Sequence, residues 1–344
     1  MRKLATIQKI KEVKDHPNAD RLSLLAFENI GWQCVSKKGE FKNGDLCVYL
    51  EIDSLISMKH EWARFLQDKN DPSKPARLRT VRLRSELSQG LAIPISAIPE
   101  LKDREIEEGE DLTDLLEIKK YEPKVPPCLN GQVKGRMPGY IKKTDEERIQ
   151  AYPELIKEFQ GVMVYITQKI DGTSGTFVHK DGVEDVCGRN WSYLEDDKNT
   201  YWEVAKKYDI LPKLKDIREK TGKNYAAQGE IHGEGIQKNR LGIKGHDLAV
   251  FNVIDLSGQK PLDFYEFKEF CERLQLVTVP ILQICEFKWQ TLEELLELAK
   301  GKYGSGKDQE GIVIRPIREF RSEVLKGRAS FKVINNEFLE KGGD

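Results

Sequence analysis

Short strand-like runs, each ended by turn residues, recur along this chain and are not interleaved with helices in a regular order. Strand patterns cover residues 162–166, 225–233, 247–256 and 310–317, and helical patterns cover 197–210 and 291–304. A doubly wound parallel sheet needs regular alternation of strand and helix, so this class is excluded. The pattern predicts an α+β fold built on antiparallel sheets.

Residues 1–118 contain mostly short strand-like runs, separated by turns such as Asn43-Gly44-Asp45. Residues 57–76, SMKHEWARFLQDKNDPSKPA, predict a short helix and a polar loop between these runs. This succession of short strands and turns predicts a small all-β barrel of the oligonucleotide-binding (OB) kind. Residues 15–25, DHPNADRLSLL, resemble the tRNA-binding barrel appended to phenylalanyl-tRNA synthetase. Within the same region, four arginines alternate with apolar residues as on a strand: Arg77, Arg79, Arg82 and Arg84. Two interpretations stay open, a surface that follows a phosphate backbone and a charged edge strand that prevents aggregation.

Residues 119–143 are rich in proline and glycine, which predicts a linker or an extended crossing segment. A second domain is predicted over residues 144–344. Thr144 and Asp145 are helix-capping residue types, and Glu147 follows Thr144 by three positions. This spacing is that of a capping box, so a helix is predicted to begin here.

Overall composition limits the classes of partner. The 344 residues are 33% charged and 39% hydrophobic, with a formal net charge of −1, so phosphate binding is expected only from local basic patches. The cysteines form no CxxC pair, which argues against a disulfide framework or a cysteine-rich zinc site: they are Cys34, Cys47, Cys128, Cys187, Cys271 and Cys285. No apolar run approaches a membrane span, and no secretory signal is found at the start. A cytoplasmic or nuclear location is expected.

Lys169 follows closely after the predicted strand 162–166, and Ile170, Asp171 and Gly172 come next. One interpretation is a surface lysine beside an Asp-Gly hairpin turn. The other is a nucleophile that the strand end presents to a pocket. The rest of the chain decides between them.

Four other segments carry polar or aromatic residues in or at the ends of apolar strands. Glu230 lies between glycines, Phe251 lies within an apolar run, Glu310 precedes Gly311, and Lys332 lies in FKVI. Together with Lys-Ile-Asp-Gly at 169–172, their order resembles motifs I, III, IIIa, IV and V of the covalent nucleotidyltransferases. This superfamily contains DNA ligases, RNA ligases and mRNA capping enzymes.

Within the superfamily, the chain resembles ATP-dependent RNA ligases of the Deinococcus type. Residues 143–150, KTDEERIQ, resemble a stretch of that branch, and the barrel precedes the transferase domain, whereas typical DNA ligases and capping enzymes carry it afterwards. The resemblance implies the ligase adenylation fold after an OB-like barrel. It also implies joining of 3′-OH and 5′-phosphate ends of RNA, with a nicked duplex as partner, through lysyl-AMP and an adenylylated 5′ end.

The resemblance also implies roles for individual residues. Lys169 attacks the α-phosphate of ATP, and Asp171 and Glu310 hold Mg²⁺ or Mn²⁺. The implied ATP contacts are Gln168, Arg148, Arg189, Glu230, Phe251, Lys326 and Lys332. Motif V of many relatives has a second lysine where this chain has Ser330, and Lys326 or Arg328 is the candidate replacement. Because an ammonium cannot attack phosphorus, the pKa of Lys169 is expected to be lowered by burial and by nearby cations.

Three alternatives remain at this point. A DNA ligase would seal DNA ends, and a capping-type guanylyltransferase would use GTP in place of ATP. A non-catalytic RNA-binding protein would rely on the barrel and would form no lysyl-nucleotide adduct.

Overall fold

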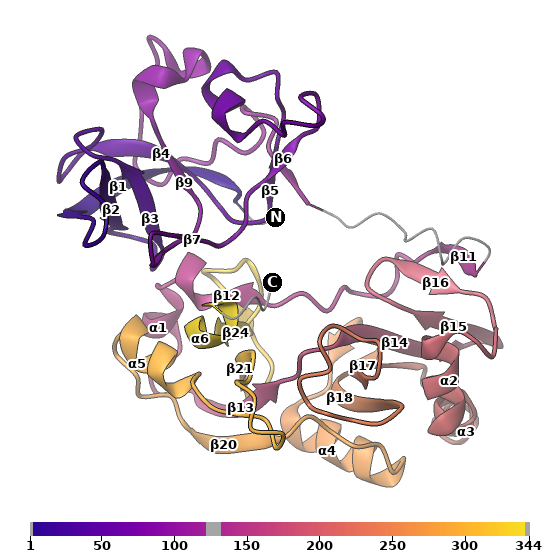
Figure 1. Cartoon of the computed structure of the whole chain (residues 1–344). Coiled ribbons are helices and arrows are strands. Elements are labelled where there is room, and N and C mark those ends of the chain that lie inside the picture. Colours follow the sequence, from indigo (N-terminus) through magenta and orange to yellow (C-terminus); the bar gives the residue numbers. More distant parts are fainter. Residues whose placement is uncertain (1–2, 122–131, 341–344) are drawn as a thin grey trace. The chain divides into compact units, whose positions relative to one another are not determined.

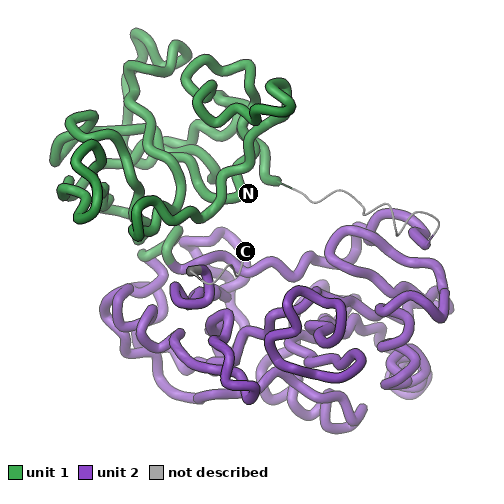
Figure 2. Tube along the Cα trace, viewed as in Figure 1, with its two compact units in different colours: residues 1–124, 150–153, 342–344 green, residues 125–149, 154–341 purple. Residues whose placement is uncertain are grey.

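The computed structural model describes residues 3–121 and 132–340, which belong to two compact units (Figure 2). Unit 1 comprises residues 1–124, 150–153 and 342–344, and unit 2 comprises 125–149 and 154–341. The predicted domain limits, 1–118, 119–143 and 144–344, stay a prediction. Part of the predicted linker belongs to a sheet, because Val133–Arg136 is a strand of unit 2.

Unit 1 is built on a five-stranded antiparallel sheet in the order β3-β2-β1-β4-β9. Residues 5–9 of β1 pair with β4, and residues 10–15 pair with β2 across a bulge near Lys11. Such a bulge bends a strand, so β1 takes part in both halves of a curved sheet, as an OB barrel requires. The strands of unit 1 are β1 Ala5–Asp15, β2 Leu22–Phe27, β3 Gln33–Lys37, β4 Leu46–Leu50, β5 Ser54–Ile56, β6 Ala76–Arg77, β7 Val81–Leu83, β8 Glu86–Ser88, β9 Leu91–Pro94 and β10 Lys119–Lys120.

Two clusters of buried side chains stabilise unit 1. One contains Ile7, Val48 and Leu112, and the other contains Leu25, Trp32 and Tyr49. The predicted short helix after Ser57 is a 3₁₀ helix, η1 Glu61–Leu66, and two further 3₁₀ turns are η2 Ile95–Ala97 and η3 Pro99–Leu101. The all-β barrel predicted for the first part of the chain is confirmed.

Unit 2 contains two sheets (Figure 1). The seven-stranded sheet has the order β11-β16-β15-β14-β17-β18-β19, and the five-stranded sheet has the order β12-β24-β21-β13-β20. A small β22–β23 hairpin is separate from both. The strands are β11 Val133–Arg136, β12 Glu147–Arg148, β13 Met163–Lys169, β14 Thr173–Lys180, β15 Val183–Cys187, β16 Trp191–Tyr193, β17 Tyr225–Gly233, β18 His246–Asp255, β19 Lys260–Pro261, β20 Ile281–Glu286, β21 Gly311–Pro316, β22 Arg321–Ser322, β23 Gly327–Arg328 and β24 Phe331–Ile334.

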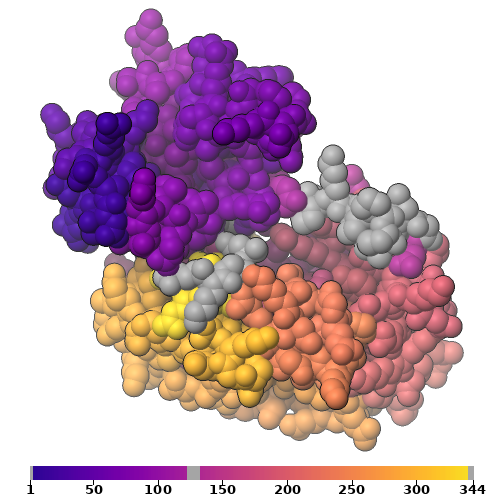
Figure 3. Space-filling model, viewed as in Figure 1, coloured from indigo at the N-terminus to yellow at the C-terminus, as the bar shows by residue number. Residues whose placement is uncertain are grey.

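The helices of unit 2 are α1 Leu155–Glu158, α2 Thr200–Lys207, α3 Ile210–Thr221, α4 Phe264–Arg273, α5 Leu292–Leu298 and α6 Asn336–Glu340, with a 3₁₀ turn at η5 Ile149–Ala151. Helices α2, α3 and α4 contribute Trp202, Leu214 and Phe267 to one buried cluster with strand residues such as Phe177. The side chains fill the spaces between the ribbons within each unit (Figure 3). The predicted helices at 197–210 and 291–304 are confirmed, whereas α3 and α4 were not predicted.

The helix predicted after Thr144 is wrong. Residues 142–146 form no regular element, and Glu147 and Arg148 form β12, which pairs in parallel with Phe331 and Lys332. Residues 147 and 148 form ladder hydrogen bonds with β24 at the sheet edge, and these bonds outweigh the local preference for a capped helix. Capping boxes do form at Asp263–Glu266 and at Thr291–Glu294, where apolar helix faces are buried.

The described residues contain free cysteines and no helix suited to cross a membrane. Cys34, Cys47, Cys187, Cys271 and Cys285 are free thiols. Cys128 lies outside the described residues. Across residues 3–121 and 132–340, we find no helix with the length and apolar character needed to span a membrane.

Candidate active site

Lys169 is the last residue of β13 and pairs with Gly311 of β21. The chain then leaves the five-stranded sheet and enters the seven-stranded sheet at Thr173. Residues 170–172 therefore connect two sheets and do not form a hairpin turn. Gly172 passes close to β17, where an added Cβ would lie 2.4 Å from the Ile231 carbonyl oxygen. The strand end thus presents Lys169 between the two sheets.

Glu310 meets this lysine from the neighbouring strand. The Lys169 Nζ donates a hydrogen bond to the Glu310 Oε2 at 2.7 Å, and the two side chains are 21% and 19% exposed. Gly311 after it has a φ of 149°, and an added Cβ there would lie 2.1 Å from the Val333 carbonyl oxygen. Only glycine fits this position, which explains the Glu-Gly step in the sequence.

The protonation state of Lys169 differs from the prediction. Burial lowers the pKa of Lys169, but the carboxylates of Glu310, Glu230 and Asp171 together outweigh it and raise this pKa above its usual value. The predicted lowering is therefore wrong for the protein without ligands, because the three nearby carboxylates raise the pKa of Lys169 more than burial lowers it. In this state Lys169 is an ammonium held by Glu310.

Two further ionisable groups of the site have strongly shifted pKa values. Burial, together with the charges of Glu310 and Asp171, raises the pKa of Glu230 on β17 to about 8. Burial, together with the charges of Arg148 and Lys169, lowers the pKa of Lys332 on β24 to about 7. Perturbed groups of this kind concentrate at functional sites.

The floor of the site is formed by cross-strand neighbours. Thr167 pairs with Val313, Val313 pairs with Lys332, and Lys332 pairs with Arg148. Paired residues lie on the same face of a sheet, and Lys169 lies on that face too, because it follows Thr167 by two positions. The ladder therefore brings two lysines and an arginine from three distant segments to one surface.

Asp171 lies beside these groups and is 8% exposed. Burial and Glu310 raise the pKa of Asp171, while Arg240 and Lys169 oppose this shift. The Arg240 Nε lies 3.3 Å from the Asp171 Oδ2, and its guanidinium lies over the Phe338 ring at 4.3 Å. Arg240 was not predicted, because the loop that carries it, residues 234–245, has no motif of its own.

The acidic side chains fit a hard cation. Among the described residues, no three His, Cys, Asp or Glu side chains converge closely enough to hold a metal ion alone. Magnesium usually keeps several waters and uses one or two carboxylates together with phosphate oxygens. The oxygens of Asp171 and Glu310 suit that coordination, because Glu310 bonds to the Lys169 amine and the charges of both raise the pKa of this amine.

Phe251 occupies an unusual position on β18. Gln228 pairs with Asn252 and Gly229 pairs with Val250, so Phe251 is the extra residue of a β-bulge. A bulge redirects a side chain, and here the ring packs beside Ile170, Ala249 and Tyr303. Arg315 supports the bulge, since its Nη1 donates to the Phe251 carbonyl oxygen at 3.2 Å. Phe251 is partly buried, and its ring therefore lies next to the residue that follows Lys169.

Three predicted nucleotide contacts have other partners. The Gln168 Nε2 donates to the Gln309 Oε1 at 2.7 Å, and strand alternation directs Gln168 away from the face of Lys169. Lys326 lies in the β22–β23 turn, 74% exposed, and pairs with Glu323. Arg328 is bound by Glu319. The site as folded therefore does not bring Lys326 to Lys332.

Residues 144–148 connect the two sheets across the site. The Thr144 Oγ1 lies 2.7 Å from the Ser174 Oγ, and Asp145 pairs with Arg189 at 3.0 Å. Glu146 accepts a hydrogen bond from the Arg315 Nη2 at 2.6 Å. The predicted contact residue Arg189 is thus held by Asp145, and Glu146 and Arg315 are site residues that sequence reasoning missed. The acidic run Asp145-Glu146-Glu147 beside a predicted pocket was the available signal.

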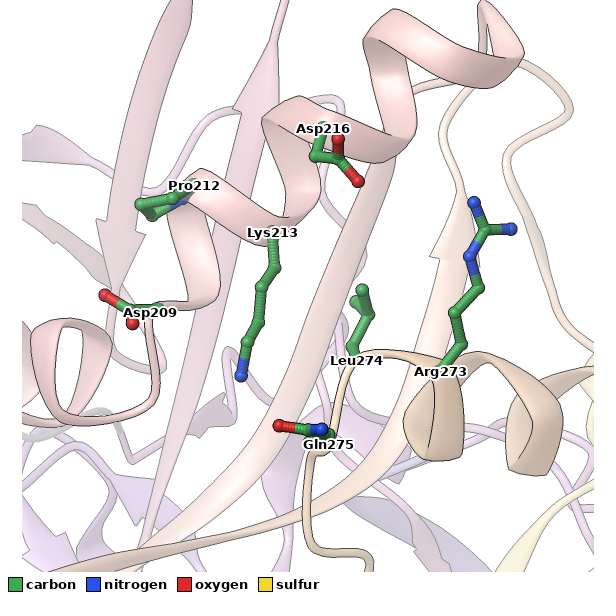
Figure 4. A pocket seen from close by; sticks show the side chains of 7 residues that line it. All are labelled: Asp209, Pro212, Lys213, Asp216, Arg273, Leu274 and Gln275. Carbon is green, nitrogen blue, oxygen red and sulfur yellow. The ribbon is translucent and has the colours of Figure 1, made fainter.

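Hollows among the described residues of unit 2 include one beside the site and one away from it. A cavity of about 230 Å³ adjoins the site and is lined by Lys143, Glu146, Phe251, Asn252 and Arg328 among others. A second hollow of about 550 Å³ lies between α3 and the end of α4, with Lys213, Asp216 and Arg273 on its walls (Figure 4). The second hollow contains none of the residues around Lys169.

Comparisons with known proteins agree with this geometry. The RNA ligase family model matches residues 162–334, and a model described as an OB-fold domain matches residues 4–95. A search of curated protein sequences finds no match. The structure of Naegleria gruberi RNA ligase with PPi is 36% identical, covers 100% of both chains and has a TM-score of 0.83. Variants of that ligase with ATP and Mn and with AMP and Mn are also 36% identical, with TM-scores of 0.84 and coverage of 100% and 99% of both chains, respectively.

Proposed function

Because the chain belongs to the RNA ligase family, we propose that it uses ATP to join a 3′-OH end to a 5′-phosphate end. The substrate is a nick in a duplex with RNA on the 3′-OH side. One observation carries the proposal: Lys169 ends a strand between two sheets with Glu310 at 2.7 Å, in the segment that matches the family. The similarity to a structure containing ATP and Mn supports both as ligands of this chain.

The first step is transfer of AMP to Lys169. A bond forms between Nζ and the α-phosphorus, the bond to pyrophosphate breaks, and the amine loses a proton. Lys169 is held as an ammonium by three carboxylates before ATP binds, so the step requires that this anionic field be offset. Mg²⁺ or Mn²⁺ at Asp171 and Glu310 supplies positive charge that offsets the carboxylates and the phosphate.

Other residues of this chain bind and orient ATP in the proposal. Lys332 and Arg148 lie next to each other on the site floor and neutralise phosphate charge. Glu230 accepts hydrogen bonds from ribose hydroxyls, and Phe251 stacks on adenine. Arg189 reaches ribose or phosphate only after it leaves Asp145. Adenylate on Lys169 then moves to the RNA 5′-phosphate, and the 3′-OH displaces AMP.

Domain order supports the finer subtype. The OB-fold match precedes the ligase match along the chain, at residues 4–95 and 162–334. This order supports assignment to RNA ligases of the Deinococcus type, which carry their barrel first. It also disfavours a DNA ligase or a capping guanylyltransferase, and an intact set of site residues disfavours a non-catalytic RNA-binding protein.

The test uses the full chain. Incubation with α-labelled ATP and GTP in parallel should give a covalent adduct with ATP alone, and nicked duplexes with RNA or DNA at each end should be joined when the 3′-OH strand is RNA. Absence of any lysyl-nucleotide adduct would reject the enzyme proposal. Joining of all-DNA nicks with equal efficiency would reject RNA specificity.

Phe251 provides a prediction on base recognition. Phe251→Ala should raise the ATP concentration needed for adduct formation by about tenfold, because base–aromatic stacking contributes about 1–3 kcal/mol. Phe251→Leu should be milder, because it keeps apolar contact area. The measurement is the initial rate of adduct formation against ATP concentration, with thermal melting as control. An unchanged ATP requirement with a lowered melting temperature would make Phe251 a core residue only.

The β7–β8 hairpin of unit 1 is the proposed RNA contact. The four arginines do not share one strand: Arg77 lies in β6 and pairs with Asp53, whereas Arg79, Arg82 and Arg84 precede or form the hairpin. Arg84 and Ser85 form its two-residue turn with φ of 49° and 78°, values that favour glycine or asparagine. Protection of an edge strand against aggregation requires charge but no backbone strain. The strain at Arg84 therefore favours a functional role for this exposed turn.

Residues of the DHPN stretch hold that strained turn in place. Asn18 N–H donates to the His16 Nδ1 at 3.1 Å, so the His16 Nε2 carries the proton and donates to the Leu83 carbonyl oxygen at 3.0 Å. The Asn18 Nδ2 donates to the Arg84 carbonyl oxygen at 3.1 Å. Val81 and Leu83 on the hairpin are 44% and 40% exposed. Guanidinium groups beside exposed aliphatic surface suit a polynucleotide, through its phosphates and its sugars or bases.

Replacing Arg79, Arg82 and Arg84 by alanine should therefore weaken binding of a nicked RNA duplex and leave the AMP adduct intact. The slope of log K against log salt should fall by about 2 to 3, because each phosphate contact contributes about 0.7–0.9. The triple replacement of Arg64, Lys69 and Lys74 by alanine is the control, since it removes the same charge from another part of unit 1. Equal effects of both triples would reject the hairpin as the contact surface.

A further inference from the structure

The hydrogen-bond ladder between β13 and β21 ends at the pair Lys169 and Gly311, next to the proposed nucleophile. Beyond that pair the two strands diverge, since the chain after Lys169 enters the other sheet. Because the strands diverge, the Lys169 carbonyl oxygen and the Glu310 N–H do not form ladder hydrogen bonds with the opposite strand. Buried backbone groups need partners, so these two must bond elsewhere. Both groups bond to the same side-chain atom, the Tyr303 hydroxyl.

The Tyr303 hydroxyl donates to the Lys169 carbonyl oxygen at 2.7 Å and accepts from the Glu310 N–H at 3.0 Å. A hydroxyl has one donor and two acceptor sites, so this arrangement uses it in both senses. Tyr303 is 3% exposed, and its ring packs with Ile170, Ala249 and Val279. The hydroxyl is therefore fixed by packing before any ligand binds.

The loop that carries Tyr303 is closed on itself. Tyr303 N–H donates to the Lys307 carbonyl oxygen at 2.8 Å, and Gly306 N–H donates to the Tyr303 carbonyl oxygen at 2.8 Å. The Gln309 Nε2 donates to the Ala299 carbonyl oxygen at 3.0 Å, which closes the base of the loop. The position of the hydroxyl is thus set by the loop and by the ring cluster independently.

We infer that Tyr303 is a positioning residue for adenylate transfer: its hydroxyl holds the Lys169 and Glu310 backbones apart at the spacing at which their side chains meet. The inference rests on the proposed function of Lys169 as nucleophile. A hydroxyl inserted between two diverging strands sets how far Lys169 stands from Glu310, and therefore where its amine lies relative to the phosphate. Misplacement of a reacting group by a fraction of an ångström lowers rate without lowering substrate affinity.

The test is Tyr303→Phe in the full chain, because phenylalanine keeps the ring and removes the hydroxyl. The rate of adduct formation at saturating ATP should fall about tenfold, as expected for losing two buried hydrogen bonds at a reacting group. The ATP concentration for half-maximal rate should change by less than about twofold, because Tyr303 does not contact ATP in the proposal. Tyr140→Phe is the matched control, since the Tyr140 hydroxyl donates to Asp185 at 3.0 Å away from Lys169.

Each outcome has a meaning. A lowered maximal rate with an unchanged ATP requirement, absent from Tyr140→Phe, supports positioning. A rate within twofold of the wild-type protein overturns the inference, and so does a Tyr303→Phe protein that fails to fold, since the hydroxyl would then serve the fold. If the wild-type protein itself forms no adduct, the proposed function fails, whatever Tyr303 does.

Discussion

Replacing Lys169 by alanine is expected to abolish the covalent AMP adduct. Alanine carries no nucleophilic group. The amine that it removes is the one that bonds to Glu310 at 2.7 Å. Lys169→Arg should be equally inactive, because a guanidinium stays charged at any accessible pH. The measurement is retention of label from α-labelled ATP on the denatured protein. Lys260→Ala, at an exposed position of β19, is the control and should keep the adduct.

The Lys169 variants should still seal a strand that is supplied already adenylylated, since this last step uses no lysyl-AMP. This result would separate loss of the nucleophile from loss of the fold. A residual adduct in Lys169→Ala would contradict the assignment, and mapping of the labelled peptide would then identify the true nucleophile.

Glu310→Gln is expected to lower the rate of adduct formation by at least about a hundredfold, because a metal ligand contributes several kcal/mol to charge stabilisation at a phosphate. Added Mg²⁺ or Mn²⁺ should restore the rate only in part. The measurement is the rate of adduct formation across a series of metal concentrations. Glu293→Gln on α5 removes the same charge from the surface and should leave the rate unchanged.

The same variant distinguishes two roles of Glu310. Among the charged neighbours of Lys169, Glu310 raises its pKa most, so removing that charge should lower this pKa and leave more neutral amine at neutral pH. If Glu310 served only to hold the ammonium, Glu310→Gln would therefore form the adduct faster than the wild-type protein. A faster reaction would contradict the role of Glu310 in metal binding.

The local pattern of the chain was sufficient for three strands that carry site residues. Residues 225–233, 247–256 and 310–317 were predicted from residue type, and β17, β18 and β21 lie there. Strand ends are marked by glycines whose positions only glycine tolerates, such as Gly172 and Gly311. Because strand periodicity and the need for glycine act within a few residues, they can be recognised in the sequence without knowledge of the fold.

Local signals failed where a distant strand supplied the deciding interaction. Thr144 and Glu147 have the spacing of a capping box, yet pairing with Phe331 and Lys332 makes Glu147 and Arg148 a strand. The bulge at Phe251 depends on how β17 and β18 align. Neither pairing partner is near in sequence, so no local window contains the information.

The order of residues by itself determined most strands of the ligase domain and the barrel that precedes it, and it led to the prediction of Lys169 as the nucleophile. These depend on periodicity, turn residues and motif order. The tertiary structure alone decided the charge state of that lysine and the parts that hold it. Glu230, Glu310 and Asp171 come from segments up to 139 residues apart. Together their charges raise the pKa of Lys169 more than burial lowers it. Tyr303 reaches Lys169 from 134 residues away. Electrostatic fields and hydrogen bonds depend on distance in space, and the sequence does not contain that distance until the sheets have formed.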